Sequence, residues 1–219
     1  MAFKLHDFAD DNKCINDTIY NVGISLGWNC DSASYGIEHN LRGKKSLGYN
    51  TCPFDLMVSN IDGVIQCIDD DFKYLTDENF LELIKESDEE STIYNNKYNF
   101  GFNHESPGHA NLYTKENWKD GKFTYVNNNY KELKLRYNNR VNNFINYCNN
   151  PNNLITFIIN TWDKKESDLY KLKDVLNKKF PTCKYKFFIM NDRHGKDYYI
   201  RHLRYMRYTE EDEELKRLL

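Results

Sequence analysis

The residues that could carry out covalent chemistry in this sequence centre on Cys30. The β-prone segment from Tyr20 to Leu26, which ends at Gly27, predicts a buried strand. Asp31 and Ser32 are suitable caps for a helix predicted over 33–41. Cys30 is therefore expected at a helix N-terminus, where the helix dipole and free backbone N–H groups lower the pKa of a thiol and stabilise its thiolate. The same N–H groups could hold an oxyanion. The competing interpretation is a structural cysteine buried behind a tight turn.

A thiol nucleophile needs a base, and His104 is the histidine that we expect to supply it. It follows a strand predicted over 98–102, whose end fixes the backbone, and catalytic groups work best when they are rigidly held. His109 competes for this role, although its Pro-Gly loop suits a lid better. His39 and His194 are further candidates, and any of the four could instead be a solvated surface histidine.

Asp55 is the candidate for a third member of the site. It follows Cys52, Pro53 and Phe54 in a segment that we expect to join a loop to a helix. A carboxylate there could face the same cleft and orient an imidazole, as in catalytic triads. The alternative is an aspartate that caps a turn.

A long amphipathic helix is predicted from Val126 to Cys148, because apolar residues recur there every three or four positions. Arg140 lies beside this apolar stripe, one turn from Tyr137 and Phe144. We expect Arg140 to be partly buried and paired with a carboxylate, with Asp55 as the first candidate. The alternative is an exposed arginine.

The second half of the chain indicates the fold class. Apolar runs over 154–159 and 185–190 predict buried strands, and a polar helix over 164–179 separates them. This alternation is typical of a parallel sheet covered by helices. Further expected elements are a helix from Ile61, a short helix over 80–84, an acidic loop over 87–91 and a strand over 198–205.

The sequence therefore predicts an α/β fold with a mostly parallel sheet flanked by helices. We expect one domain over 18–208, a polar N-terminal arm over 1–17 and a charged C-terminal tail over 209–219.

Composition excludes several functional classes. The 219 residues carry 30 Lys and Arg against 33 Asp and Glu, a net charge of −3, so no basic face for nucleic acid is indicated. The longest apolar runs are too short to cross a bilayer, and the charged start differs from a signal peptide. We therefore expect a soluble, cytoplasmic protein with no nucleic-acid or membrane partner, in an oligomeric state that the sequence leaves open.

The cysteines and histidines also argue against metal or disulfide chemistry. The six cysteines form no C-x-x-C pair, which favours free thiols in a chain of this size. The histidines show no metal-ligand spacing with other donors. We expect neither a metal nor another cofactor.

Four motifs in this chain occur in the order that they have in a known family. They are Ser25-Leu26-Gly27-x-Asn29-Cys30, Pro53-Phe54-Asp55, Phe102-x-His104 and Arg136-Tyr137-x-x-Arg140-Val141-x-x-Phe144. Over residues 20–165 the chain resembles a family of papain-like cysteine peptidases from bacteria and giant viruses. The resemblance implies Cys30 as the nucleophile, His104 as its base and Asp55 as a helper.

The resemblance also implies an alternative fold, the papain-like α+β fold. In that fold the nucleophile begins a helix and the histidine stands on a strand of a largely antiparallel sheet. The chain departs from the family pattern at several positions: Leu56 replaces a tryptophan, Glu105 replaces an aspartate, and Asn139 and Asn143 stand where arginines are common. These changes leave the nucleophile and the base in place. They remove arginines that would contribute to a basic substrate-binding face, so such a face is not expected here.

We therefore predict a thiol-dependent hydrolase or acyl-transferase that acts on a peptide, amide or acyl substrate. If the chain is viral, we expect it in the host cytoplasm or the virion. One alternative is a non-catalytic or carbohydrate-pathway α/β protein that binds a nucleotide or sugar at the strand ends. Another is an interaction protein with a tyrosine-rich surface. The predicted catalytic residues are Cys30, His104 and Asp55, and the predicted substrate-binding residues are Ser25, Gly27, Asn29 and Arg140.

Overall fold

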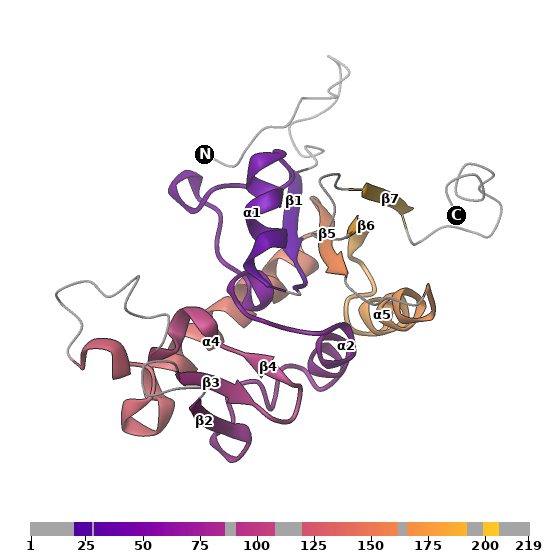
Figure 1. Ribbon diagram of the computed structural model, residues 1–219. Helices are drawn as coiled ribbons and strands as arrows, with labels where there is room; N and C mark the ends of the chain where they lie inside the picture. Colours follow the sequence, from indigo (N-terminus) through magenta and orange to yellow (C-terminus); the bar gives the residue numbers. More distant parts are fainter. Residues whose placement is uncertain are drawn as a thin grey trace.

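The computed structural model (Figure 1) describes residues 20–27, 29–85, 91–107, 120–161, 166–191 and 199–205. Its α-helices are α1 (Cys30–Glu38), α2 (Ile61–Asp69), α4 (Asn127–Asn149) and α5 (Glu166–Lys179). Its strands are β1 (Tyr20–Ser25), β2 (Leu81–Lys85), β3 (Ser91–Asn95), β4 (Phe100–Gly101), β5 (Asn153–Thr161), β6 (Lys184–Asn191) and β7 (Tyr199–Tyr205). Short 3₁₀-helices are η1 (Lys45–Leu47), η2 (Pro53–Leu56), η3 (Glu78–Phe80), η4 (Asn103–Glu105) and η5 (Gly121–Phe123).

The larger sheet has the strand order β1-β5-β6-β7. β1 and β6 both run parallel to the central strand β5, and β7 is antiparallel to β6. The helices α1 and α4 contact β5, and α5 packs against α2. The prediction of an α/β fold with a mostly parallel sheet flanked by helices is confirmed.

The continuous apolar run in β5 is explained by burial of both sheet faces. Side chains alternate along a strand, so Ile155, Phe157 and Ile159 face one side, where they join the core formed with α4 and α5. Ile158 faces the other side and packs with Tyr35 of α1. A strand covered on both faces needs no polar side, and this is why its sequence does not alternate.

The smaller sheet, β2-β3-β4, is antiparallel and was not predicted. The expected helix over 80–84 is wrong, because this segment forms β2 and pairs with β3 from Leu81↔Asn95 to Lys85↔Ser91. Leu, Glu and Lys favour helices locally, but cross-strand pairing and the burial of Leu81 outweigh that preference here. Figure 1 places this sheet in the lower part of the view and the four-stranded sheet in the upper part.

α4 confirms the predicted amphipathic helix, whose stripe forms a large part of the core. Leu133, Tyr137, Phe144 and Cys148 are buried. The helix begins with a left-handed turn, since residues 128–130 have φ values between 53° and 59°. Two of these three residues are asparagines, the non-glycine type that adopts this conformation most readily together with Asp and His.

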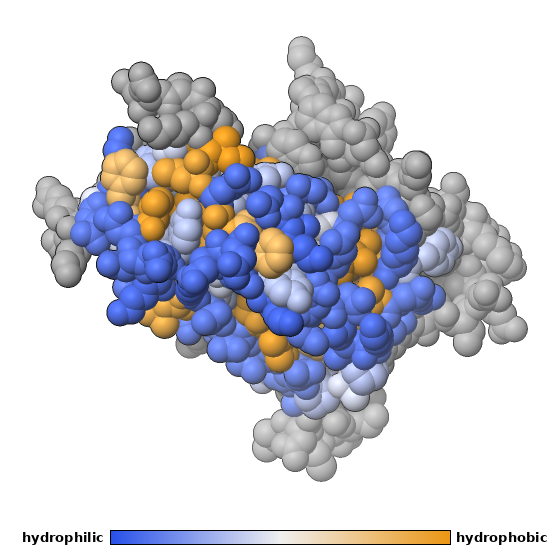
Figure 2. Space-filling view, turned by 90° about the horizontal axis from the view of Figure 1, so that it is seen from below, coloured by the Kyte–Doolittle hydropathy of each residue, from blue (hydrophilic) through white to orange (hydrophobic). Residues whose placement is uncertain are grey.

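The surface is largely hydrophilic where it can be seen. Figure 2 shows mainly hydrophilic residues on the face viewed from below, with hydrophobic residues in several separate groups. Within the described ranges, no helix has the length and apolar character needed to span a membrane. The predicted N-terminal arm (1–17) and C-terminal tail (209–219) lie outside the described residues.

Candidate functional site

Cys30 is the first residue of α1, just after the turn that leaves β1. Asn29 caps this helix: its backbone is extended, and its Oδ1 accepts a hydrogen bond from the N–H of Asp31 at 3.0 Å. The helix thus starts earlier than predicted, and its cap is Asn29 and not Asp31 or Ser32. Cys30 is partly exposed to solvent.

Burial separates Cys30 from the other cysteines that the structure describes. Cys52, Cys67, Cys148 and Cys183 are all buried, with at most 2 % of their surface exposed. Burial raises the pKa of the first three of these thiols well above the usual 9.0, so they stay protonated at neutral pH. Within the described part of the chain, Cys30 is therefore the cysteine with access to solvent. Cys14 lies outside that part.

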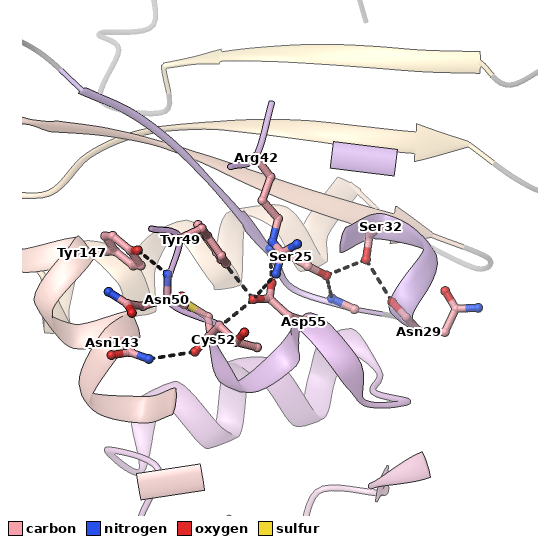
Figure 3. A network of polar contacts seen from close by, with 12 residues as sticks. Ser25, Asn29, Ser32, Arg42, Tyr49, Asn50, Cys52, Asp55, Asn143 and Tyr147 are labelled. Atoms are coloured by element: carbon pink, nitrogen blue, oxygen red, sulfur yellow. Dashed lines mark hydrogen bonds and ion pairs between the residues drawn. The ribbon is translucent and has the colours of Figure 1, made fainter. Parts of the chain in front are cut away.

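Asp55 lies in η2, and its carboxylate is completely buried. Its Oδ2 accepts hydrogen bonds from Arg42 Nη2 at 2.9 Å, Tyr49 Oη at 3.0 Å and the Cys52 N–H at 2.7 Å. Its Oδ1 accepts one from the N–H of Ser25, the last residue of β1, at 3.2 Å. Figure 3 shows these donors converging on the carboxylate. The bond to Cys52 caps η2, as the alternative interpretation predicted, and none of the four donors is a histidine.

A chain of hydroxyl groups continues from Asp55 to the start of α1 (Figure 3). The Ser25 and Ser32 hydroxyls lie 2.6 Å apart, and Ser32 Oγ donates to the carbonyl of Asn29 at 3.1 Å. Ser25 Oγ therefore donates to Ser32, and it accepts from the N–H of Gly27 at 3.2 Å. These bonds join the end of β1 to the helix cap, so the backbone around Cys30 is held from both sides.

His104 lies in η4, directly after the short strand β4, and is partly exposed. The strand predicted over 98–102 is confirmed but is only Phe100–Gly101. On the far side of His104, Ser106 Oγ donates to the carbonyl of Phe102 at 2.7 Å and accepts from the N–H of Ile93 at 2.8 Å. These bonds fix both ends of the segment 102–106, called the His104 turn below.

Glu105, the neighbour of His104, has a fully buried carboxylate between two arginines of α4. Its Oε1 lies 2.9 Å from Arg136 Nε and 3.0 Å from Arg140 Nη2, and Tyr137 Oη donates to Oε2 at 3.1 Å. Burial, followed by the charge of Glu105, raises the pKa of Tyr137 well above 10.0. The phenol therefore keeps the proton that it donates to Glu105.

The segment formed by Val58 and Ser59 connects the turns that carry Cys30 and His104. On one side, Ser59 Oγ donates to the carbonyl of Leu26 at 3.4 Å, and a Cβ added to Gly27 would lie 1.7 Å from that oxygen. On the other side, Val58 and Gly101 exchange two backbone hydrogen bonds of 2.8 Å. The turn after β1 and the end of β4 are therefore bonded to two adjacent residues.

Arg140 is buried more deeply than predicted, with 5 % of its side chain exposed, and it is paired with a carboxylate as predicted. The predicted partner is wrong: Asp55 pairs with Arg42, and Arg140 pairs with Glu105. Burial by itself lowers the pKa of Arg140, but interactions with Tyr137, Glu105 and Asp55 outweigh it and raise the pKa. Asp55 thus acts on Arg140 through its charge without forming the ion pair.

The other predicted substrate-binding residues lie in or beside the turn between β1 and Cys30, called the Cys30 turn below. Ser25 is completely buried, and its polar groups are bonded to Asp55, Ser32 and Gly27. Gly27 has a φ of 97°, a conformation that favours glycine, and it is in contact with Ser59. Asn29 is partly exposed. Contact of these residues with a substrate stays a prediction.

Of the competing histidines, the structure describes His39, and no contact given for it involves the turns near Cys30 and His104. His39 caps the C-terminal end of α1, is exposed and stacks on Tyr35, with 3.9 Å between ring centroids. His109 and His194 lie outside the described residues. Across the described ranges, no group of three or more His, Cys, Asp or Glu is arranged to hold a metal ion.

Sequence reasoning missed the residues that hold the two carboxylates. Arg42 and Tyr49 were not singled out, because they reach Asp55 through a loop whose path no local pattern defines. Glu105 was noted only as a departure from the family pattern. A usable signal was present for Glu105: two arginines one helical turn apart, Arg136 and Arg140, need a carboxylate when they face the core.

Comparison with known proteins gives one match. The model of a family described as "putative papain-like cysteine peptidase" matches residues 21–195. No curated protein and no solved structure matches the chain. The matched range contains both the Cys30 turn and the His104 turn and most of the chain. The chain therefore belongs to this family of papain-like cysteine peptidases.

Proposed function

We propose that this protein is a thiol-dependent hydrolase or acyl-transferase in which Cys30 is the nucleophile and His104 is the general base. The observation that carries the proposal is the arrangement around Val58 and Ser59. The turn that leads to Cys30 is bonded to Ser59, and β4, the strand that leads to His104, is bonded to the adjacent Val58. Cys30 and His104 are both partly exposed, so a substrate could reach each of them.

The proposed reaction follows from these groups. His104 accepts the proton of the Cys30 thiol, and the thiolate attacks the carbonyl carbon of a peptide, amide or ester substrate. The imidazolium then gives its proton to the leaving group, which departs and leaves a thioester on Cys30. Attack by water on this thioester gives hydrolysis, and attack by another nucleophile gives acyl transfer.

One of the N–H groups expected from the sequence to hold the oxyanion has a partner within the protein. The N–H of Asp31 donates to Asn29 Oδ1 and is therefore occupied. The Cys30 N–H and the side-chain NH₂ of Asn29 are our candidates, since preorganised amide donors stabilise the charge that develops on a carbonyl oxygen. Asn29 thus contacts the substrate, as the sequence predicted, and Gly27 lets the acyl group approach the backbone.

Asp55 acts in this proposal as a positioning residue. Its four donors fix η2, Arg42 and the end of β1, and the hydroxyl chain from Ser25 to Ser32 extends this order to Asn29. Asp55 and Ser25 therefore fix the backbone that carries Cys30 through hydrogen bonds and do not touch the substrate. Arg140 supports the base in the same way, through Glu105.

The proposal is tested first by the selectivity of thiol modification. Brief treatment with iodoacetamide at neutral pH, followed by mass mapping, is expected to label Cys30 first. The helix N-terminus stabilises its thiolate, whereas burial raises the pKa of Cys52, Cys67 and Cys148. Labelling of Cys14, Cys148 or Cys183 ahead of Cys30 would contradict a nucleophilic role for Cys30.

The base is tested by the alkylation rate of Cys30 as a function of pH. We expect His104→Ala to lower the rate near neutral pH by roughly 100-fold, the usual contribution of a positioned base. His109→Ala is the matched control and should change the rate only a few-fold. A pH profile of His104→Ala that overlays the wild type would remove His104 from the mechanism.

A further inference from the structure

Glu105 is buried at a cost that its surroundings must offset. Its carboxylate has no exposed surface, and it is held by Arg140, Arg136 and Tyr137, which all belong to α4. Buried ion pairs stabilise a fold little or not at all compared with apolar residues of the same size. What such a cluster does provide is a fixed orientation, because two arginine charges and one tyrosine hydroxyl, all from one helix, hold the two carboxylate oxygens in place.

The cluster lies one peptide bond from His104. η4 is a single 3₁₀ turn, so the position of the Glu105 side chain sets the backbone of the residue before it. The other anchors of this turn come from the opposite direction, where Phe102 and Ser106 are bonded to Ile93 of β3. The His104 turn is thus held between α4 and the smaller sheet.

We propose that Glu105 is a positioning residue, which holds His104 at the orientation needed for proton transfer by anchoring the His104 turn to Arg140 and Arg136. This inference rests on the proposed function, because Glu105 acts through His104. Glu105 stands where the family pattern has an aspartate, and it therefore keeps the carboxylate that the turn requires. Arg136 and Arg140, one turn apart on α4, are the partners that hold this carboxylate.

Glu105→Gln tests the proposal, since it keeps the shape of the side chain and removes its charge. The measurement is again the alkylation rate of Cys30 as a function of pH. We expect a fall of about 10-fold or more near neutral pH, because small displacements of a catalytic group are costly, and a profile shifted towards that of His104→Ala. Glu105→Asp retains the charge and should recover most of the rate.

Glu78→Gln is the matched control. Glu78 of η3 forms an ion pair with Lys134 of α4, so the same chemical change removes a carboxylate that is paired with the same helix, but at an exposed pair outside η4. This variant should keep the wild-type profile. If Glu105→Gln lowers the melting temperature but its profile overlays the wild type, Glu105 is only structural and the inference is overturned.

A second variant covers the case in which Glu105→Gln does not fold. Arg136 is partly exposed, and Arg136→Gln leaves the Glu105–Arg140 pair in place. A smaller shift of the profile in the same direction supports the proposal, and an unchanged profile overturns it. Failure of the proposed function itself gives a different result, namely a wild-type profile for His104→Ala.

Discussion

Asp55 and Glu105 share one feature at the scale of single residues: each is a carboxylate with no exposure to solvent. Removing a charge from water without a partner is costly, so each is paired with an arginine and a tyrosine hydroxyl. Interaction with Asp55 and Tyr49 also raises the pKa of Arg42, although burial acts against it. Both carboxylates are therefore held by a cation and a hydroxyl donor.

Replacing Asp55 by asparagine should destabilise the fold strongly. The variant leaves the charge of Arg42 buried without a counter-ion, and loss of one partner of a buried pair costs about 3–5 kcal/mol. The measurement is the free energy of unfolding from urea denaturation. Asp69→Asn is the control: its partner Lys178 is exposed and screened by solvent, so the change should be much smaller. Equal losses in the two variants would contradict the role of Asp55.

At the scale of elements, the site depends on turns and not on the length of any helix or strand. The turn after β1 is bonded to Ser59, and the end of β4, just before the His104 turn, is bonded to Val58; both residues follow η2. Gly27 makes the first of these contacts possible, because it combines a positive φ with the absence of a side chain.

Gly27→Ala should therefore disturb the site more than a general cost of backbone strain would. A Cβ at this position would lie 1.7 Å from Ser59 Oγ, so either the Cys30 turn or Ser59 must move. We expect a lower stability and a slower alkylation of Cys30. Gly121→Ala is the matched control, since Gly121 also has a positive φ but has nothing within 4 Å of an added Cβ. Similar alkylation rates in the two variants would show that the Gly27–Ser59 contact does not position Cys30.

The elements that could be predicted from the sequence are those whose own residues define them. β5 and β6 are continuous apolar runs, and α4 carries an unbroken stripe, so each is indicated by a pattern within a single segment. β2 could not be predicted, because its five residues suit a helix equally well and only pairing with β3 decides the outcome.

The same distinction applies to the site. Cys30 could be placed at a helix start from its neighbours alone, and the structure has it there. The pairing of Asp55 with Arg42, and of Glu105 with Arg140, depends on how loops and helices meet in space. With 33 acidic residues and several arginines in the chain, no local pattern selects the partners, and the pairing predicted between Arg140 and Asp55 was wrong.

At the scale of the whole molecule, the buried tyrosines make the stability of the fold decrease at high pH. Burial raises the pKa of Tyr49, Tyr98 and Tyr137 above the usual 10.0, so these phenols stay protonated in the folded state. In the unfolded chain they ionise near pH 10. The unfolded state thus binds fewer protons above that pH, and the stabilising contribution, complete below pH 10, is lost as pH rises further.

We therefore expect alkaline unfolding that starts near pH 10. Ultraviolet absorbance of phenolate should show that only part of the 17 tyrosines titrate in the native protein. The rest should titrate in a second step that coincides with loss of circular dichroism. The protein in denaturant serves as the control, in which all tyrosines titrate together. If all of them titrate near pH 10 while the circular dichroism stays native, the buried phenols do not have this effect.

The pairing of β1 with β5 has a consequence for the order of events during synthesis. β1 lies at the edge of its sheet, and its one neighbour there, β5, follows both the smaller sheet and α4 in the chain. A nascent chain therefore exposes Cys30 on the ribosome long before the strand that completes its support has been made, and such long-range pairing forms slowly. The thiol acquires its ordered surroundings only after β5 has emerged, which ties the arrival of reactivity to the synthesis of a strand more than 100 residues further along the chain.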